Sequence, residues 1–174
     1  MNQAEVLNVG WSEVEAWLRS VARDCRFDTI VGVTRCGLPL AAALSALAPE
    51  AALAVLARRG PRGDKPPSYD FAADRKARML ALQSTFELTS LPQTASQVLV
   101  VDDVATYGDT LFMAREKVRA AAPKAAIYFA CYAADIERLR ANRADVLQDL
   151  HYALAIDNAQ TWVSFPWNLE PISR

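Results

Sequence analysis

The sequence predicts an α/β fold in which a central parallel sheet is flanked by helices, with a small C-terminal hood. Short apolar or β-branched segments alternate with segments of helical periodicity along the chain. The apolar segments are continuous, as expected for strands that are buried on both faces of a parallel sheet. The chain has 174 residues, of which 52% are hydrophobic, and this is the size and composition of one globular domain.

The first part of the chain predicts two helices and two strands. A capping-box pattern at Ser12–Glu15 is followed by apolar residues at helical spacing, which indicates a helix. The β-branched segment TIVGV indicates a buried strand, an Ala/Leu-rich helix follows it, and a second apolar strand comes next. These elements are expected, in order, at residues 13–23, 29–33, 40–47 and 53–57.

The middle of the chain breaks this alternation. Residues 58–70 are rich in Gly, Pro and charge and have no apolar period, so we expect a loop. Residues 74–88 fit either an extended arm or a short helix, and 91–97 form another loop. A long loop in a compact domain is more often functional or mobile than idle, so we expect a mobile loop over about 58–90.

The second half resumes the alternation of strands and helices. The apolar segment VLVV ends in two acidic residues, and a turn with a glycine and then a helix follow. We expect strands at 98–101, 126–132 and 152–156, a turn at 107–110, and helices at 111–122 and 135–142. Residues 1–156 are expected to form the core, and 157–174 a hood segment of the same domain, which holds two of the four tryptophans.

Charge and composition exclude several classes of protein. Nineteen basic and twenty acidic residues leave a net charge of −1, which argues against a nucleic-acid binder. The apolar runs are shorter than the roughly 18 residues of a membrane span, and the N-terminus lacks the pattern of a signal peptide. Cys25, Cys36 and Cys131 form no metal or redox spacing, which indicates reduced thiols in a cytoplasmic protein. His151 is the single histidine, so no mechanism can use two.

The clearest functional signal is VLVVDDVATYGDT, residues 98–110. A buried strand delivers Asp102 and Asp103 to its carboxyl end, where ligands bind in open α/β sheets. The loop and the helix start that follow offer backbone N–H groups and the positive end of a helix dipole, which suit a phosphate. The two carboxylates can then hold sugar hydroxyls or a hydrated Mg²⁺ ion. The alternative is a solvated Asp-Asp turn in which Thr110 caps the helix.

This segment resembles the signature with which type I phosphoribosyltransferases bind 5-phosphoribosyl 1-pyrophosphate (PRPP): an apolar strand, two acidic residues and a loop ending in Thr-Gly-x-Thr. Residues 30–39, IVGVTRCGLP, look like the pyrophosphate loop of that family. Ser68-Tyr69 lies where these enzymes begin their mobile active-site loop. The tail 161–167, TWVSFPW, is similar to the hood of bacterial xanthine-guanine and hypoxanthine phosphoribosyltransferases. The resemblance covers most of the chain in the same order and implies the type I phosphoribosyltransferase fold.

The resemblance also implies a set of site residues. Asp102 and Asp103 would hold the ribose hydroxyls and Mg²⁺, the cofactor, through water, and Arg35 would act on the pyrophosphate. The other implied residues are Cys36 and Gly37 in the pyrophosphate loop, Thr106, Tyr107, Gly108, Asp109 and Thr110 at the 5-phosphate, Ser68 and Tyr69 in the mobile loop, and Trp162, Val163 and Cys131 at the base. The implied activity is transfer of ribosyl 5-phosphate from PRPP to a purine-like nucleobase, with release of pyrophosphate, by a cytoplasmic homodimer or tetramer with no membrane or nucleic-acid partner.

Several positions depart from the family pattern. Tyr107 replaces a small hydroxyl residue in the phosphate loop, and Asp109 adds a negative charge there; we expect both side chains to point outward, Asp109 toward solvent. Thr106 and Cys131 stand where the 6-oxopurine enzymes carry an Asp and a Lys that read the base. These departures favour an alternative function, a regulatory protein of this fold that binds a nucleotide or PRPP and has little or no transferase activity. A non-purine acceptor is a third interpretation, and packing within the hood is the alternative to base stacking for Trp162.

Overall fold

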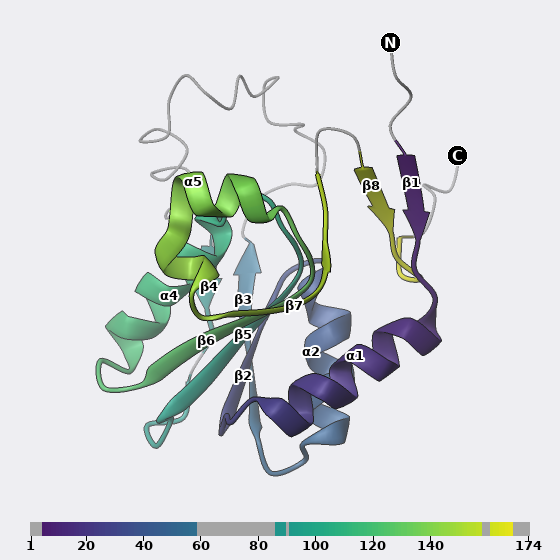
Figure 1. Cartoon of the computed structure of the whole chain (residues 1–174). Helices are drawn as coiled ribbons and strands as arrows, with labels where there is room; N and C mark the ends of the chain where they lie inside the picture. Colours follow the sequence, from purple (N-terminus) through teal and green to yellow (C-terminus); the bar gives the residue numbers. More distant parts are fainter. Residues whose placement is uncertain (1–4, 59–85, 90, 158–160, 169–174) are drawn as a thin grey trace, which may run out of the picture.

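A computed structural model describes residues 5–58, 86–89, 91–157 and 161–168 of the chain. Within these residues a six-stranded sheet has the strand order β4-β3-β2-β5-β6-β7 (Figure 1). Its strands are β2 (Thr29–Val33), β3 (Ala52–Arg58), β4 (Phe86–Leu88), β5 (Gln97–Ala105), β6 (Ala126–Ala134) and β7 (Leu150–Ala155). Every neighbouring pair is parallel except β3 and β4, so the predicted parallel sheet is confirmed with one antiparallel edge strand.

Four helices of the described residues cover the two faces of this sheet (Figure 1). Helices α1 (Trp11–Asp24) and α2 (Gly37–Leu47) pack on one face, against side chains such as Ile30 and Leu99. Helices α4 (Asp109–Ala121) and α5 (Ile136–Leu147) pack on the other, against Val31, Val100 and their neighbours. Because successive strand residues face opposite sides, each buried strand supplies both cores, and this is why the strands are apolar without interruption.

The start of α1 differs from the predicted capping box. The helix begins at Trp11, two residues before the predicted start, and Ser12 lies inside it. Gly10 is the N-cap residue, and the carboxylate of Glu13 accepts a hydrogen bond from the Gly10 N–H at 2.6 Å. A carboxylate three residues after the N-cap therefore caps the helix, as in the predicted pattern, but it belongs to Glu13 rather than Glu15, two residues earlier, because glycine is also accepted at the N-cap position.

Helix α5 is longer than predicted. It runs to Leu147, whereas the apolar pattern indicated an end at Asn142. The helix is interrupted at Arg143, whose φ of −148° and ψ of 58° are not helical, so the periodicity before and after this residue does not match.

The hood pairs the two ends of the described chain. Strand β8 (Thr161–Ser164) lies parallel to β1 (Glu5–Asn8), a strand that the sequence analysis did not predict, and together they form a small sheet apart from the main one (Figure 1). A row of aromatic rings connects this small sheet to the core: Trp11 to Trp167 at 5.5 Å between ring centroids, Trp167 to Phe165 at 4.8 Å, and Phe165 to Tyr132 of β6 at 5.7 Å. The hood is thus packed onto the sheet through the tail that follows β8.

No helix of the described residues is long and apolar enough to cross a membrane.

Candidate functional site

The strand order places a topological switch between β2 and β5. From β2 the chain passes through α2 to β3 on one side, and from β5 through α4 to β6 on the other. The two connections leave in opposite directions, so the carboxyl ends of β2 and β5 open a crevice between them. Ligands of open α/β sheets bind at such crevices.

A pocket of about 210 Å³ lies at this switch point. Its lining combines residues of the two segments that the sequence analysis singled out. The residues are Val33, Thr34, Arg35, Cys36, Phe86, Asp102, Asp103 and Thr110. Five of them were predicted as site residues; Phe86 was missed because β4 fell in a segment with no clear period, and only its pairing with β3 brings it to the pocket.

The two carboxylates lie within β5 rather than after it, contrary to the predicted end of the strand at Val101. Strand β5 continues to Ala105 because β6 offers partners along the whole length: Asp102 pairs with Cys131, and Ala105 with Ala134. The Asp103 N–H donates to Asp102 Oδ1 at 3.0 Å, and the Val104 N–H donates to Asp103 Oδ1 at 2.7 Å. The carboxylates are therefore held by backbone donors of a regular strand, not by a solvated turn.

Burial and mutual proximity perturb the ionisation of both carboxylates. Burial, and then the neighbouring Asp103, raise the pKa of Asp102 well above its ordinary value. Burial also raises the pKa of Asp103, against the opposing effect of the hydrogen bond from the Val104 N–H. Two adjacent carboxylates that resist ionisation are stabilised by hydroxyl donors or by a cation, and perturbed groups in a pocket are typical of functional sites.

The segment after β2 is pressed against these carboxylates. A Cβ atom added to Gly37 would lie 2.7 Å from Asp102 Cα and would overlap the Val101 carbonyl oxygen, so no larger residue fits. The peptide bond between Thr34 and Arg35 is cis. Burial, followed by the charges of Asp103 and Asp102, raises the pKa of the Cys36 thiol to about 12, so the thiol is neutral at physiological pH.

Residues 106–110, which the sequence predicts to bind a phosphate, connect β5 to α4 and include the first two residues of that helix; we call them the phosphate loop. Gly108 is the N-cap residue of α4 and has a φ of +75°, a conformation that favours glycine. The loop therefore leads directly into a helix N-terminus, with its free N–H groups and positive dipole end. Tyr107 is half-buried, and Arg138 Cζ lies 5.2 Å from the centroid of its ring.

The expectation that Asp109 points to solvent is wrong. Its side chain is only 5% exposed and forms an ion pair with Arg143 of α5, with 2.9 Å between Asp109 Oδ1 and Arg143 Nη2. The partner is 34 residues away in the sequence, so local pattern could not have indicated it.

The three residues predicted at the base do not line the 210 Å³ pocket. Cys131 is fully buried in the core between the sheet and α4 and α5, and Val163 is buried in the core on the other face. Trp162 lies on β8 with 63% of its surface exposed. Their base-binding role stays a prediction, as does the role of Ser68 and Tyr69, which lie outside the described residues.

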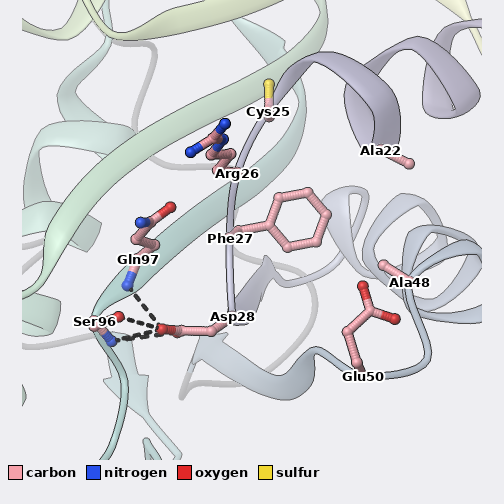
Figure 2. A pocket seen from close by; sticks show the side chains of 9 residues that line it. All are labelled: Ala22, Cys25, Arg26, Phe27, Asp28, Ala48, Glu50, Ser96 and Gln97. Carbon is pink, nitrogen blue, oxygen red and sulfur yellow. Dashed lines mark hydrogen bonds between the residues drawn. The ribbon is translucent and has the colours of Figure 1, made fainter.

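A second pocket, of about 360 Å³, lies at the opposite end of β2 and β5 (Figure 2). Asp28 lines this pocket, and its carboxylate accepts three hydrogen bonds: from the Ser96 hydroxyl at 2.6 Å, the Ser96 N–H at 2.9 Å and the Gln97 N–H at 3.1 Å. The Asp28 N–H and carbonyl also bond to Gln97 and Ala52. Asp28 thus ties together the beginnings of β2, β3 and β5, which is a structural role.

A sequence profile of the phosphoribosyl transferase domain matches residues 10–173. The chain belongs to this family. Its fold is similar to that of a purine phosphoribosyltransferase from Pyrococcus horikoshii, with a TM-score of 0.66, 23% identity and 97% coverage of each chain. It is also similar to the xanthine-guanine-hypoxanthine phosphoribosyltransferase of Helicobacter pylori, with a TM-score of 0.60, 14% identity and 95% coverage of each chain.

A third structure of this fold is a hypothetical protein from Neisseria gonorrhoeae with bound ppGpp. It has a TM-score of 0.63 and 12% identity, and the match covers 97% of this chain and 92% of that one. No curated protein matches the sequence.

The family uses Mg²⁺ together with PRPP, and the site of this phosphoribosyl transferase domain fits such an ion. Among the described residues, no group of three or more His, Cys, Asp and Glu side chains could hold a metal on its own. The pocket instead offers the two neighbouring carboxylates Asp102 and Asp103, whose ionisation a cation would favour. Mg²⁺ commonly binds with one or two carboxylates and completes its coordination with substrate phosphates and water.

Proposed function

We propose that this phosphoribosyl transferase domain transfers ribosyl 5-phosphate from PRPP to a purine-like nucleobase and releases pyrophosphate. The observation that supports the proposal is the pocket at the switch point. It gathers Asp102 and Asp103 of β5, Arg35 and Cys36 after β2, and Thr110 at the start of α4. Hydrogen-bond donors for a phosphate and for a pyrophosphate, and carboxylate acceptors for a diol, thus line one pocket or adjoin it.

Each segment has a role in the proposed reaction. The backbone N–H groups of the phosphate loop bind the 5-phosphate, and Thr106 and Thr110 add hydroxyl donors. Asp102 and Asp103 accept hydrogen bonds from the two ribose hydroxyls and hold the sugar while its C1 develops positive charge. Arg35 and the N–H groups at Cys36 and Gly37 bind the pyrophosphate that leaves as the new C1–N bond forms. Mg²⁺, when bound, supplies charge neutralisation of the pyrophosphate. Catalysis consists of positioning and charge stabilisation.

The base is proposed to lie under the hood, residues 157–174. Trp162 is exposed on β8, so its ring face is available for stacking on a planar acceptor. The side chain of Val163 is buried, so any contact from this residue would come from its backbone. The buried Cys131 offers no amine to an exocyclic oxygen, which favours a purine-like acceptor other than an ordinary 6-oxopurine. Ser68 and Tyr69 are proposed to close over the site. Assembly as a homodimer or tetramer and a cytoplasmic location belong to the same proposal.

The test is binding of PRPP by calorimetry, with Mg²⁺, to the wild type and to Asp102→Asn/Asp103→Asn. We expect the affinity to fall by about ten- to a hundred-fold or more, because each carboxylate accepts a charge-assisted hydrogen bond worth roughly 1.5–3 kcal/mol. Asp149→Asn is the matched control, since Asp149 is exposed just before the start of β7 and does not line the pocket. Undiminished affinity in the double variant would refute the proposed diol site.

A second candidate function is a regulatory protein that binds PRPP or a nucleotide without efficient transfer. It is favoured by Tyr107 in the phosphate loop and by Cys131, which stands where the 6-oxopurine enzymes of the family carry a Lys that reads the base. Pyrophosphate release with PRPP, Mg²⁺ and a panel of nucleobases distinguishes the two. Release with one or more bases supports the enzyme, and PRPP binding without release with any base supports the regulator.

A further inference from the structure

Helix α5 packs directly on the backbone of the phosphate loop. A Cβ atom added to Gly108 would lie 2.8 Å from Leu139 Cδ2 and 3.0 Å from Arg143 Cβ, so the helix and the loop are in contact with no space between them. Any ligand bound by the loop therefore has α5 as its supporting layer.

Arg143 makes three contacts with the segment that begins α4. Its Nη2 lies 2.9 Å from Asp109 Oδ1, its Cζ lies 4.1 Å from the centre of the Phe112 ring, and its Cβ borders Gly108. The ion pair is buried, with 14% of the Arg143 side chain and 5% of the Asp109 side chain exposed. Helix α5 is interrupted at this residue, which shows that the local backbone departs from the helix where the contact is made.

The ion pair neutralises a negative charge that would otherwise repel a phosphate bound by the phosphate loop. Asp109 is the first residue of α4, so its negative charge lies at the helix end that would attract a phosphate. A carboxylate there stabilises the empty helix end but repels an incoming phosphate dianion. The Arg143 guanidinium, with Nη2 2.9 Å from Asp109 Oδ1, neutralises this charge.

We propose that Arg143 is a positioning residue for phosphate binding, which acts by neutralising Asp109 and by holding the start of α4 in place. The proposal rests on the proposed function, in that the loop 106–110 is taken to bind the 5-phosphate. It adds a residue from a helix outside the pocket, and it explains how this chain carries an acidic residue in a phosphate-binding loop.

The first test measures the affinity for ribose 5-phosphate by calorimetry. Arg143→Met removes the charge and keeps most of the aliphatic packing. Arg140→Met is the matched control, because it removes the same charge from an exposed position on the same helix. We expect Arg143→Met to weaken binding by about tenfold, as for one unpaired charge a few ångströms from the phosphate, and Arg140→Met by less than about twofold. Equal effects of the two variants overturn the proposal.

The second test separates charge neutralisation from simple loss of structure. The double variant Arg143→Met/Asp109→Asn has no carboxylate at position 109. Its affinity for ribose 5-phosphate should therefore lie within about threefold of that of Asp109→Asn alone, and the salt dependence of this affinity should match that of Asp109→Asn as well. If the double variant binds as weakly as Arg143→Met, neutralisation of Asp109 is not the mechanism. If Arg143→Met does not fold, the double variant, which buries no unpaired charge, is compared with Asp109→Asn directly, and a loss above about threefold overturns the proposal.

Hydrogen exchange of the unliganded protein distinguishes this proposal from the proposed function. The amides of residues 108–112 should exchange at least about threefold faster in Arg143→Met than in Arg140→Met, because the start of α4 loses its anchor. If the wild type binds no ribose 5-phosphate, the proposed function fails at this loop, and faster exchange then supports only the holding of α4. Unchanged exchange overturns the holding role whatever the protein binds.

Discussion

Gly37 is the position at which the smallest change should disturb the site most. Its missing side chain allows the start of α2 to lie against β5, with the added Cβ 2.7 Å from Asp102 Cα and in overlap with the Val101 carbonyl oxygen. Ordinary carbon–carbon contacts are about 3.5–4.0 Å, so Gly37→Ala requires a shift of about 1 Å between the two segments. The atoms on the other side belong to the backbone of a central strand, so the loop must move rather than the strand.

The cost can be estimated from this overlap. Overpacking of a well-filled interior costs about 1–3 kcal/mol, and a domain of this size loses roughly 2–4 °C in Tm per kcal/mol. Gly37→Ala should therefore lower the Tm by roughly 2–12 °C in a thermal unfolding experiment. The same shift moves Arg35 and Cys36 relative to the carboxylates, and a misplacement of about 1 Å can cost around a hundred-fold in such a site, so PRPP affinity should fall at least about tenfold.

The matched control is Ala42→Ser, an exposed position on the same helix. It tests the effect of a substitution in α2 that does not touch β5, and it should change the free energy of unfolding by no more than about 0.5 kcal/mol and leave PRPP binding unchanged. The reasoning is refuted if Gly37→Ala has the Tm and the PRPP affinity of the wild type. A lower Tm with unchanged PRPP affinity would show that the close contact serves the fold but not the site.

Three further predictions concern other positions in the chain. Tyr107→Thr should tighten PRPP binding by about ten- to a hundred-fold in calorimetry, because a small hydroxyl regains one charge-assisted hydrogen bond; unchanged affinity contradicts this. Burial opposes the ionisation of Asp28, but the hydrogen bonds that its carboxylate accepts outweigh burial and lower its pKa. The ionised carboxylate therefore stabilises the fold at pH values above its pKa in the unfolded chain, about 3.9. Asp28→Asn should therefore cost about 1–2 kcal/mol at neutral pH, and this difference should vanish as the pH falls through the lowered pKa; a difference that is independent of pH in urea unfolding would count against it. Trp162→Ala should leave the free energy of unfolding within about 0.5 kcal/mol but weaken acceptor binding, whereas the buried Val163→Ala should cost about 1–3 kcal/mol; similar unfolding costs for the two would contradict their different burial.

Much of the fold is encoded locally. The strand at residues 29–33 was predicted with the bounds that the structure shows, because five consecutive buried positions leave a continuous apolar signal. The phosphate loop was predicted for a comparable reason: an apolar strand, two carboxylates, a glycine and a helix start follow each other within 13 residues, 98–110. Patterns of this kind depend on neighbours in the sequence, so the sequence alone determines them.

The ends of the elements depend on partners that are distant in the sequence. Strand β5 passes Asp102 and Asp103 because β6 extends alongside it, and β8 exists as a strand because β1 pairs with it from the other end of the chain. The pocket forms because α2 and α4 leave the sheet in opposite directions, which brings Arg35 next to the two carboxylates.

The charge balance of the site was also decided by tertiary structure. The sequence placed Asp109 at a helix start with a solvated carboxylate, which is where such a residue is stable without a partner. In the folded chain α5 covers that helix start, water is largely excluded, and the carboxylate is buried against Arg143. The sequence determined which charged groups the loop carries. The packing of α5 decided which of these charges are neutralised within the protein, because a charge that is removed from water needs an oppositely charged partner, and that partner can be distant in the sequence.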